Sequence, residues 1–237
     1  MFDKEEIIDY GDSGILIKFS DIFNEKLWEK THLFSNEFKK RQIIGILSVV
    51  PTLTSVFIHF NLLETNRYYL KKIITDILEK EDWKNNNLNS KKYRIPVVFG
   101  GDYGPDIDDV KAESGKTEKE LIEQFTSKPH RILCISRGPM MSSPINQKIK
   151  RNASPRQSIP AGTLNAAYNQ IGISWVSAPS GWKSIGQTPA ILFDHTQLPP
   201  SALKPGDYLD LFSIDYREFD HYKIQGIERL DVDSHAQ

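Results

Sequence analysis

The chain of 237 residues contains a single cysteine, Cys134, so no intrachain disulfide can form. Cys134 lies in the apolar run 132–135, and nothing near it in the sequence would lower the pKa of a thiol. We therefore expect a buried, inert side chain there. No apolar stretch approaches the ~20 residues that cross a bilayer, and the first residues lack the pattern of a secretory signal. These absences predict a cytoplasmic protein.

The chain also lacks an excess of either charge. It has 30 basic and 31 acidic side chains and a net charge of −1, which predicts neither a nucleic-acid nor a membrane partner. The histidines show no spacing typical of metal ligands, so no metal site is expected. The run 115–117 reads like the end of a phosphate-binding loop, but Val110 stands where that loop needs glycine. We expect no ATP site on this chain alone.

What is present is a globular composition, with 39% apolar and 26% charged residues. Residues 1–88 show apolar periodicities of strands and helices, which predict a small α+β sandwich domain. Its expected elements are strand 15–19, helix 24–42, strands 43–50 and 55–60, and a helix with the apolar stripe 70–78 capped by Thr65 or Asn66. The polar, asparagine-rich segment 81–92 is the expected linker.

Residues 93–230 change to short strands and turns, which we interpret as a β-barrel domain, with 231–237 as a polar tail. After an opening strand, Asp106 is expected to cap a short helix that Gly115 ends, and Thr117 and Glu120 form a capping box for the next helix. The expected strands are 93–99, 131–135, 162–168, 171–176, 190–193 and 208–214.

Two turns rich in proline and glycine, 154–162 and 179–189, flank a β-rich run. Proline fixes φ and glycine permits backbone conformations denied to other residues, so such turns can hold backbone groups in a set geometry around a small molecule. The alternative is that both are only structural turns of a β domain.

Four motifs occur along the chain in the same order as in one known family, which they resemble. They are the run 10–17 (YGDSGILI), the run 45–51 (GILSVVP), the stretch 95–107 (IPVVFGGDYGPDI), and LPP followed by KPGD at 198–207. The family is that of the bacterial 5-oxoprolinase B subunit, also described as allophanate hydrolase subunit 1, and it includes an inhibitor of a sporulation histidine kinase. The resemblance implies an N-terminal α+β domain and then a cyclophilin-like β-barrel. It also implies the 5-oxoprolinase C subunit as a partner and a third subunit that completes ATP-dependent opening of 5-oxoproline.

The chain resembles a divergent member of that family. In the loop 136–143 only Pro139 remains of the usual aromatic and glycine-rich motif, and Gln187 stands where relatives carry arginine. Arg137 lies in the altered loop and is a candidate to supply the missing charge.

The resemblance and the turns place a small amide or carboxylate at one mouth of the barrel, lined by 136–143, 156–162 and 180–188. The candidate substrate-binding residues are Arg137, Pro139, Arg156, Pro160, Gly162, Gly181, Trp182, Gly186 and Thr188. Arg156 either holds an anion or caps a turn, and Trp182 either packs or binds. No catalytic residue can be assigned.

Two functions are compatible with these observations. The first is a subunit of an ATP-dependent 5-oxoprolinase-like or allophanate-hydrolase-like amidohydrolase complex, inactive alone, which acts with a homologue of the C subunit and with a third subunit. The second is a regulatory binding protein that inhibits a sensor histidine kinase, which the altered loop 136–143 favours because a binding module need not keep a reaction pocket.

Overall fold

The computed structural model describes residues 5–80, 88–225 and 228–230. The chain divides into two compact units, Met1–Leu88 and Asn89–Gln237. Residues 81–87 of the expected linker and the expected tail 231–237 lie outside the described residues. Each unit is described by itself.

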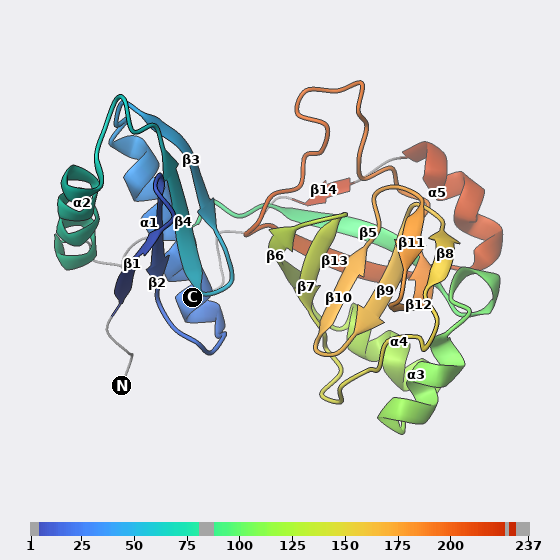
Figure 1. The fold of residues 1–237 in the computed structure, drawn as a ribbon. Helices are drawn as coiled ribbons and strands as arrows, with labels where there is room; N and C mark the ends of the chain where they lie inside the picture. Colours follow the sequence, from blue (N-terminus) through green and yellow to red (C-terminus); the bar gives the residue numbers. More distant parts are fainter. Residues whose placement is uncertain (1–4, 81–87, 226–227, 231–237) are drawn as a thin grey trace. The chain divides into compact units, whose positions relative to one another are not determined.

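The first unit is a two-layer sandwich of a sheet and two helices (Figure 1). Its antiparallel sheet has the order β1-β2-β4-β3. The elements are β1 (Glu6–Tyr10), β2 (Gly14–Lys18), α1 (Glu25–Lys40), β3 (Ile46–Pro51), β4 (Ser55–Phe60) and α2 (Arg67–Lys80). Alternate residues of β4 are buried and pack with the apolar sides of both helices in one core. This arrangement follows from an apolar period of two residues in the strand and of 3.6 residues in the helices.

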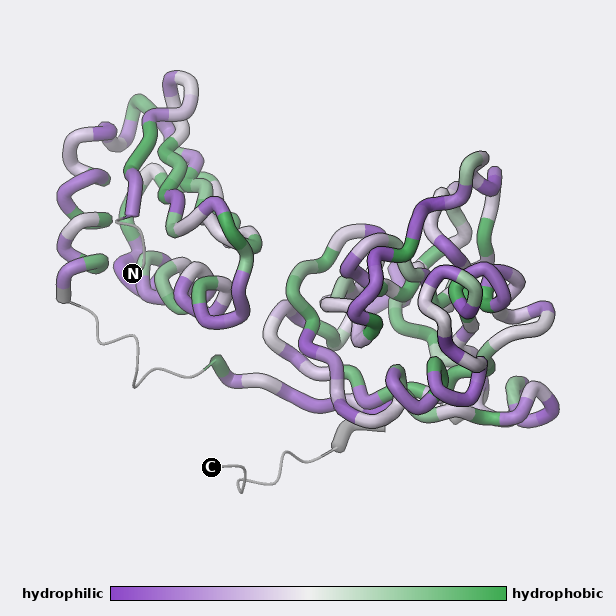
Figure 2. Tube along the Cα trace, turned by 90° about the horizontal axis from the view of Figure 1, so that it is seen from below, coloured by the Kyte–Doolittle hydropathy of each residue, from purple (hydrophilic) through white to green (hydrophobic). Residues whose placement is uncertain are grey.

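Both helices of this unit start where the sequence indicates. The Asn24 side chain accepts a hydrogen bond from the Leu27 backbone N–H at 2.9 Å and caps α1. For α2 the cap is Asn66 rather than Thr65, because Asn66 Oδ1 accepts from the Tyr69 N–H at 2.9 Å. Hydrophobic residues recur about once per turn along these helices (Figure 2).

The second unit is a closed β-barrel with helices at its side. Seven of the described strands form the ring β12-β9-β10-β7-β6-β13-β5, which β12 closes by pairing with β5. The barrel strands are β5 (Lys92–Phe99), β6 (His130–Ile135), β7 (Pro139–Ser142), β9 (Thr163–Ala167), β10 (Gln170–Ile173), β12 (Lys183–Gln187) and β13 (Tyr208–Ser213). The predicted α+β class, a sandwich domain followed by a β-barrel, is confirmed.

The remaining elements surround this ring. They are the helices α3 (Ile107–Ser114), α4 (Glu118–Thr126) and α5 (Phe219–Gln225), the 3-10 turns Gly101–Tyr103 and Tyr216–Glu218, the paired strands β8 (Arg156–Ile159) and β11 (Ala178–Ser180), and β14 (Glu228–Leu230) beside β5. Gly115 ends α3 with a φ of 69°, and the capping box of Thr117 and Glu120 starts α4, both as expected.

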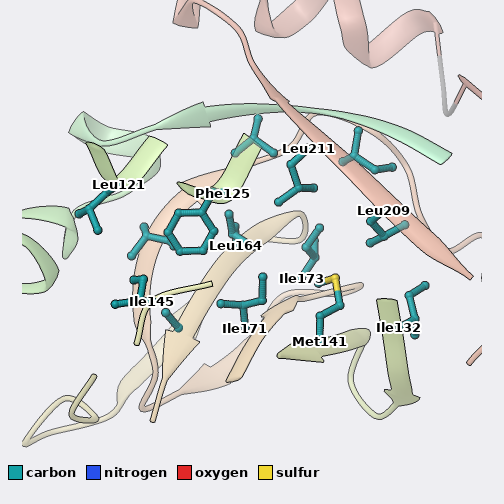
Figure 3. Packing of buried hydrophobic residues seen from close by; sticks show 14 of the residues in the cluster. Leu121, Phe125, Ile132, Met141, Ile145, Leu164, Ile171, Ile173, Leu209 and Leu211 are labelled. Carbon is teal, nitrogen blue, oxygen red and sulfur yellow. The ribbon is translucent and has the colours of Figure 1, made fainter. Parts of the chain in front are cut away.

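Apolar side chains fill the inside of the barrel (Figure 3). Leu164, Ile171, Ile173, Leu209 and Leu211 point inward from three strands and are at most 1% exposed. Phe125 of α4 joins the same core. The interior of this barrel is therefore occupied by side chains of the chain itself.

Two local expectations were wrong. The segment 190–193 forms no strand: Ala190 and Leu192 pack into the core, Ile191 is exposed, and Phe193 stacks on Trp175 with ring centroids 5.2 Å apart. The segments 154–162 and 179–189, read as turns, contain the strands β8, β11 and β12. These strands are short and contain or adjoin prolines, so the sequence shows no clear alternation of apolar and polar residues there.

Candidate functional site

A cavity of ≈ 200 Å³ lies on the outer face of the barrel wall. The loop before β7, strands β9 and β10, and the turn between β11 and β12 surround it. Asn165 and Gly172 line it, whereas their strand neighbours Leu164 and Ile171 face the barrel core, so strand alternation places the cavity outside. The predicted residues Arg137, Pro139 and Trp182 thus line a cavity against the barrel wall, and the packed interior lies behind it.

The altered loop 136–143 still forms one wall of this cavity. Gly138 has a φ of 155°, and a Cβ atom there would lie 1.8 Å from the backbone oxygen of Ile173. Only glycine fits such an approach. The loop is therefore held tightly against β10, and it carries the exposed Arg137 and the buried Pro139 to the cavity.

Three of the predicted residues meet at this cavity: Arg137, Pro139 and Trp182. The guanidinium of Arg137 donates from Nη1 to the backbone oxygen of Pro179, which ties its side chain to β11. Trp182 lies over Gly172, where an added Cβ would come within 3.9 Å of the Trp182 ring. The remaining predicted residues lie elsewhere.

Arg156 does not line the cavity but forms a bidentate ion pair with Asp106, with N–O distances of 2.5 and 2.7 Å. Asp106 also accepts hydrogen bonds from the Ser184 N–H (2.8 Å) and Asn152 Nδ2 (3.3 Å). Burial raises the pKa of Asp106, but the hydrogen bonds from Arg156, Ser184 and Asn152 outweigh it, and the net pKa is lowered.

This ion pair corrects two expectations. Asp106 stands at the N-terminal cap position of α3, but its side chain makes no capping bond there. Arg156 uses its guanidinium for an ion pair that fastens β8 to the start of α3. The bidentate geometry uses both terminal nitrogens of Arg156, which leaves little of the guanidinium for an anion.

Gly162 and Thr188 line a second cavity of ≈ 290 Å³. Gly162 has a φ of 80°, and a Cβ there would lie 2.3 Å from the Thr188 backbone oxygen. Gln187, at the position of the family's arginine, donates from Nε2 to the Ala161 backbone oxygen at 2.9 Å. The walls of this second cavity are mainly apolar and include the stacked pair of Trp175 and Phe193.

The last three predicted residues, Pro160, Gly181 and Gly186, take part in contacts within the barrel unit. Pro160 is exposed, and its backbone oxygen accepts from Thr163 Oγ1 at 2.7 Å. The Gly181 backbone oxygen accepts from the Asn152 N–H at 2.8 Å. At Gly186 a Cβ would lie 2.7 Å from the Val98 backbone oxygen, so glycine lets β12 close the barrel against β5.

Sequence reasoning missed the polar wall of the first cavity. Asn165, Ser174 and Ser180 line it, and Asn165 is linked by hydrogen bonds to Ser174 and Ser184. One signal was available: Asn165 lies between the apolar residues Leu164 and Ala166 of strand β9, and a buried amide in a central strand needs partners.

The first cavity presents hydrogen-bond donors and no proton-transfer group. Arg137 is its sole titratable lining residue among the described residues, and none of the lining residues is aspartate, glutamate, histidine, lysine or cysteine. The described part of the chain contains no group of three or more metal-ligating side chains and no helix long and apolar enough to cross a membrane. Such a cavity is suited to holding an acceptor-rich small molecule.

The fold and this cavity define a two-unit α+β protein with a polar cavity on the wall of a closed β-barrel. The chain belongs to the family described as carboxyltransferase domain, subdomain C and D, whose model matches residues 6–203. The resemblance read from the motifs is thereby confirmed.

Relatives with described functions are named as the B subunit of 5-oxoprolinase. The protein of Bacillus subtilis (strain 168) is 27% identical over 233 residues, which span 93% of this chain and 97% of that protein. The protein of Escherichia coli O157:H7 is 35% identical over 122 residues, which span 50% of this chain and 56% of that protein.

Solved structures show the same fold. A conserved uncharacterized protein from Pyrococcus horikoshii is 28% identical, has a TM-score of 0.50, and is matched over 90% of this chain and 100% of its own length. The urea amidolyase of Kluyveromyces lactis has a TM-score of 0.75 at 16% identity and is matched over 95% of this chain but 16% of its own length. At that identity the likeness supports the fold alone.

Proposed function

We propose that this chain is the B-type subunit of an ATP-dependent amidohydrolase complex that acts on a small anionic amide of the 5-oxoproline or allophanate type. It acts with a homologue of the 5-oxoprolinase C subunit and with a third subunit, and ATP is used by the complex. The observation that carries the proposal is the similarity to the 5-oxoprolinase B subunit of Bacillus subtilis along almost the whole of both chains.

The cavity supports a binding role within such a complex. Its lining offers the guanidinium of Arg137 for a carboxylate and hydroxyls for a carbonyl, but no base or nucleophile with a lowered pKa. The chain therefore supplies recognition of the amide, and partner subunits supply the groups that move protons and use ATP. A subunit of this kind is inactive when purified alone.

The alternative function is inhibition of a sensor histidine kinase. One observation supports it, the altered sequence of the loop 136–143. That loop still carries Arg137, Gly138 and Pro139 to a cavity, so the sequence change is compatible with a retained small-molecule site. Partner identity separates the two functions. Co-purification of the tagged chain with a homologue of the C subunit supports the enzyme, whereas co-purification with a kinase supports the alternative.

The direct test is ATP-dependent formation of glutamate from 5-oxoproline. We expect no turnover from this chain alone and turnover from the chain combined with the C subunit homologue and the third subunit. Arg137→Ala removes a charged hydrogen bond, so binding should weaken about 10- to 100-fold. Arg217→Ala is the matched control, because Arg217 is exposed and pairs with Asp215 rather than lining the cavity.

Three outcomes contradict parts of the proposal. Full activity of the chain alone would refute the subunit role. An assembled complex that forms no glutamate would refute 5-oxoproline as the substrate. Equal binding by the Arg137→Ala and Arg217→Ala variants would remove Arg137 from the site.

A further inference from the structure

Hydrogen bonds inside the cavity wall make Ser174 Oγ an acceptor and leave its hydroxyl proton for another partner. Asn165 Nδ2 donates to the backbone oxygen of Thr163 at 2.9 Å and to Ser174 Oγ at 3.2 Å. A backbone oxygen only accepts, so turning the Asn165 amide round would lose the bond to Thr163. Ser174 Oγ is therefore an acceptor in this contact, and its own O–H is left to donate.

The other end of the same chain of bonds agrees with this direction. Asn165 Oδ1 is an acceptor, and Ser184 Oγ lies 3.2 Å away and donates to it. The backbone N–H of Ser184 is in turn held by the carboxylate of Asp106 at 2.8 Å. Asn165 and Ser184 are only 4% and 3% exposed, so the protein rather than solvent sets the orientation of this chain.

Ser180 presents a second hydroxyl in the same way. Its Oγ accepts from the backbone N–H of Trp182 at 3.2 Å, and the residue is 5% exposed. Across residues 5–80, 88–225 and 228–230, neither Ser174 nor Ser180 donates its hydroxyl proton in any protein hydrogen bond. Ser180 is buried, whereas Ser174 is half-buried and lines both cavities. An acceptor atom of a molecule in the first cavity would take a hydrogen bond from each hydroxyl.

The two hydroxyls and Arg137 make the cavity complementary to a molecule that carries acceptors. A carboxylate suits the charged guanidinium of Arg137. A neutral carbonyl oxygen suits the hydroxyls, since a neutral O–H donates a hydrogen bond without needing a charged acceptor. Met140, Pro139 and Trp182 supply the apolar remainder of the wall. This combination matches a small anionic amide better than a plain carboxylic acid.

We propose that Ser174 and Ser180 are specificity-determining residues that donate hydrogen bonds to the carbonyl oxygen of the bound amide. Asn165 is a positioning residue that keeps Ser174 in its donor orientation. The inference rests on the proposed function for the ligand class, but the donor direction follows from the wall itself.

The test is calorimetric binding to the complete chain with three probes: 5-oxoproline, oxamate, and cyclopentanecarboxylate. The first two are anionic amides, and the third has the carboxylate but no amide carbonyl. Wild type should bind both amides more tightly than cyclopentanecarboxylate. Ser174→Ala should weaken binding of the amides about threefold to tenfold and leave cyclopentanecarboxylate unchanged, whereas Ser174→Thr, which keeps a hydroxyl, should restore amide binding.

Ser201→Ala is the matched control for Ser180→Ala. Ser201 Oγ accepts the backbone N–H of Leu203, two residues on, at 3.2 Å, as Ser180 Oγ accepts that of Trp182. Ser201 lies outside the cavity lining. Ser180→Ala should weaken amide binding and Ser201→Ala should not.

A further variant tests the donor direction. In Asn165→Asp a carboxylate oxygen faces Ser174 and accepts a hydrogen bond from its hydroxyl. That hydroxyl no longer donates into the cavity, so amide binding should fall although the Ser174 hydroxyl is still present. Thermal melting establishes whether this variant folds. Should it unfold, the Ser174 and Ser180 variants decide the question.

The inference is overturned if Ser174→Ala weakens all three probes equally or none of them, if wild type binds cyclopentanecarboxylate as tightly as the amides, or if wild type binds no probe. If the proposed function is wrong but this inference is right, the experiments give a different result. In that case the assembled complex does not turn over 5-oxoproline, while oxamate binding still depends on Ser174.

Discussion

The ion pair between Arg156 and Asp106 makes a quantitative prediction about stability. The Asp106 side chain is 7% exposed and that of Arg156 is 35% exposed. Removing one partner of a buried pair costs about 3–5 kcal/mol, because the remaining charge stays buried without compensation. Since Arg156 is partly solvated and Ser184 and Asn152 still donate to Asp106, we expect Arg156→Ala to cost about 2 kcal/mol. For a unit of this size that lowers the melting temperature by about 4–8 °C.

The chain offers a matched control for this effect. Arg217 and Asp215 form the same two-point contact, with N–O distances of 2.8 and 2.9 Å, but their side chains are 75% and 41% exposed. Hydrogen bonding from Arg217 lowers the pKa of Asp215 to about 2. Solvent screens an exposed pair, so Arg217→Ala should leave the free energy of unfolding unchanged within error.

The assay is calorimetry together with denaturant unfolding followed by tryptophan fluorescence. Trp175 and Trp182 report the barrel unit and Trp28 reports the first unit, so the transition that shifts can be assigned. Equal shifts for Arg156→Ala and Arg217→Ala, or a shift confined to the first unit, would refute the reasoning.

The pH dependence of the same pair has a definite sign. The folded-state pKa of Asp106 lies below the ordinary aspartate value of 3.8, so its contribution to stability is complete above pH 3.8 and is lost as the pH falls through the lower folded-state pKa. In Arg156→Ala the buried carboxyl loses its main partner and protonates more easily. The stability difference between wild type and Arg156→Ala should therefore be largest near neutral pH and shrink in acid.

Three further predictions concern other parts of the barrel unit. Gly138→Ala should disrupt the cavity and abolish amide binding, because its Cβ would lie 1.8 Å from the Ile173 backbone oxygen. Gly101→Ala is strained by a φ of 53° but has nothing within 4 Å of the added Cβ, so it should retain binding in the same calorimetric assay. Thr117→Ala removes the cap of α4 and should lower the unfolding free energy by about 1 kcal/mol in denaturant titration; an unchanged midpoint contradicts this. Burial raises the pKa of the Cys134 thiol, so its reaction with a disulfide reagent at pH 8 should be slower than that of a free thiol and should speed up in denaturant; equal rates in the two conditions contradict this.

The parts of the fold that the sequence predicted depend on contacts between near neighbours. Asn24 caps α1 through a residue three positions on, and Thr117 and Glu120 form their capping box over the same spacing. The apolar stripe 70–78 of α2 likewise repeats within single turns. These interactions are complete within a few residues, so the residue types alone specify them.

The candidate site was predicted in part. The loop 136–143 and the turn with Trp182 do meet at a cavity, because the family resemblance carries the order of the strands that bring them together. The partners of Arg156 and Ser174 were not predictable in this way. Arg156 meets Asp106 fifty positions away, and Ser174 meets Asn165 across the hairpin of β9 and β10.

The sequence by itself determined the starts of α1 to α4 but not α5, the presence of a sandwich unit and a β unit, and the family. Only the tertiary structure decided which face of each barrel strand points inward, and hence that Leu164 fills the core while Asn165 forms the wall of an outer cavity. The physical reason is that β9 is buried on both faces, so the face that points into the core depends on neighbours that lie far away in the chain.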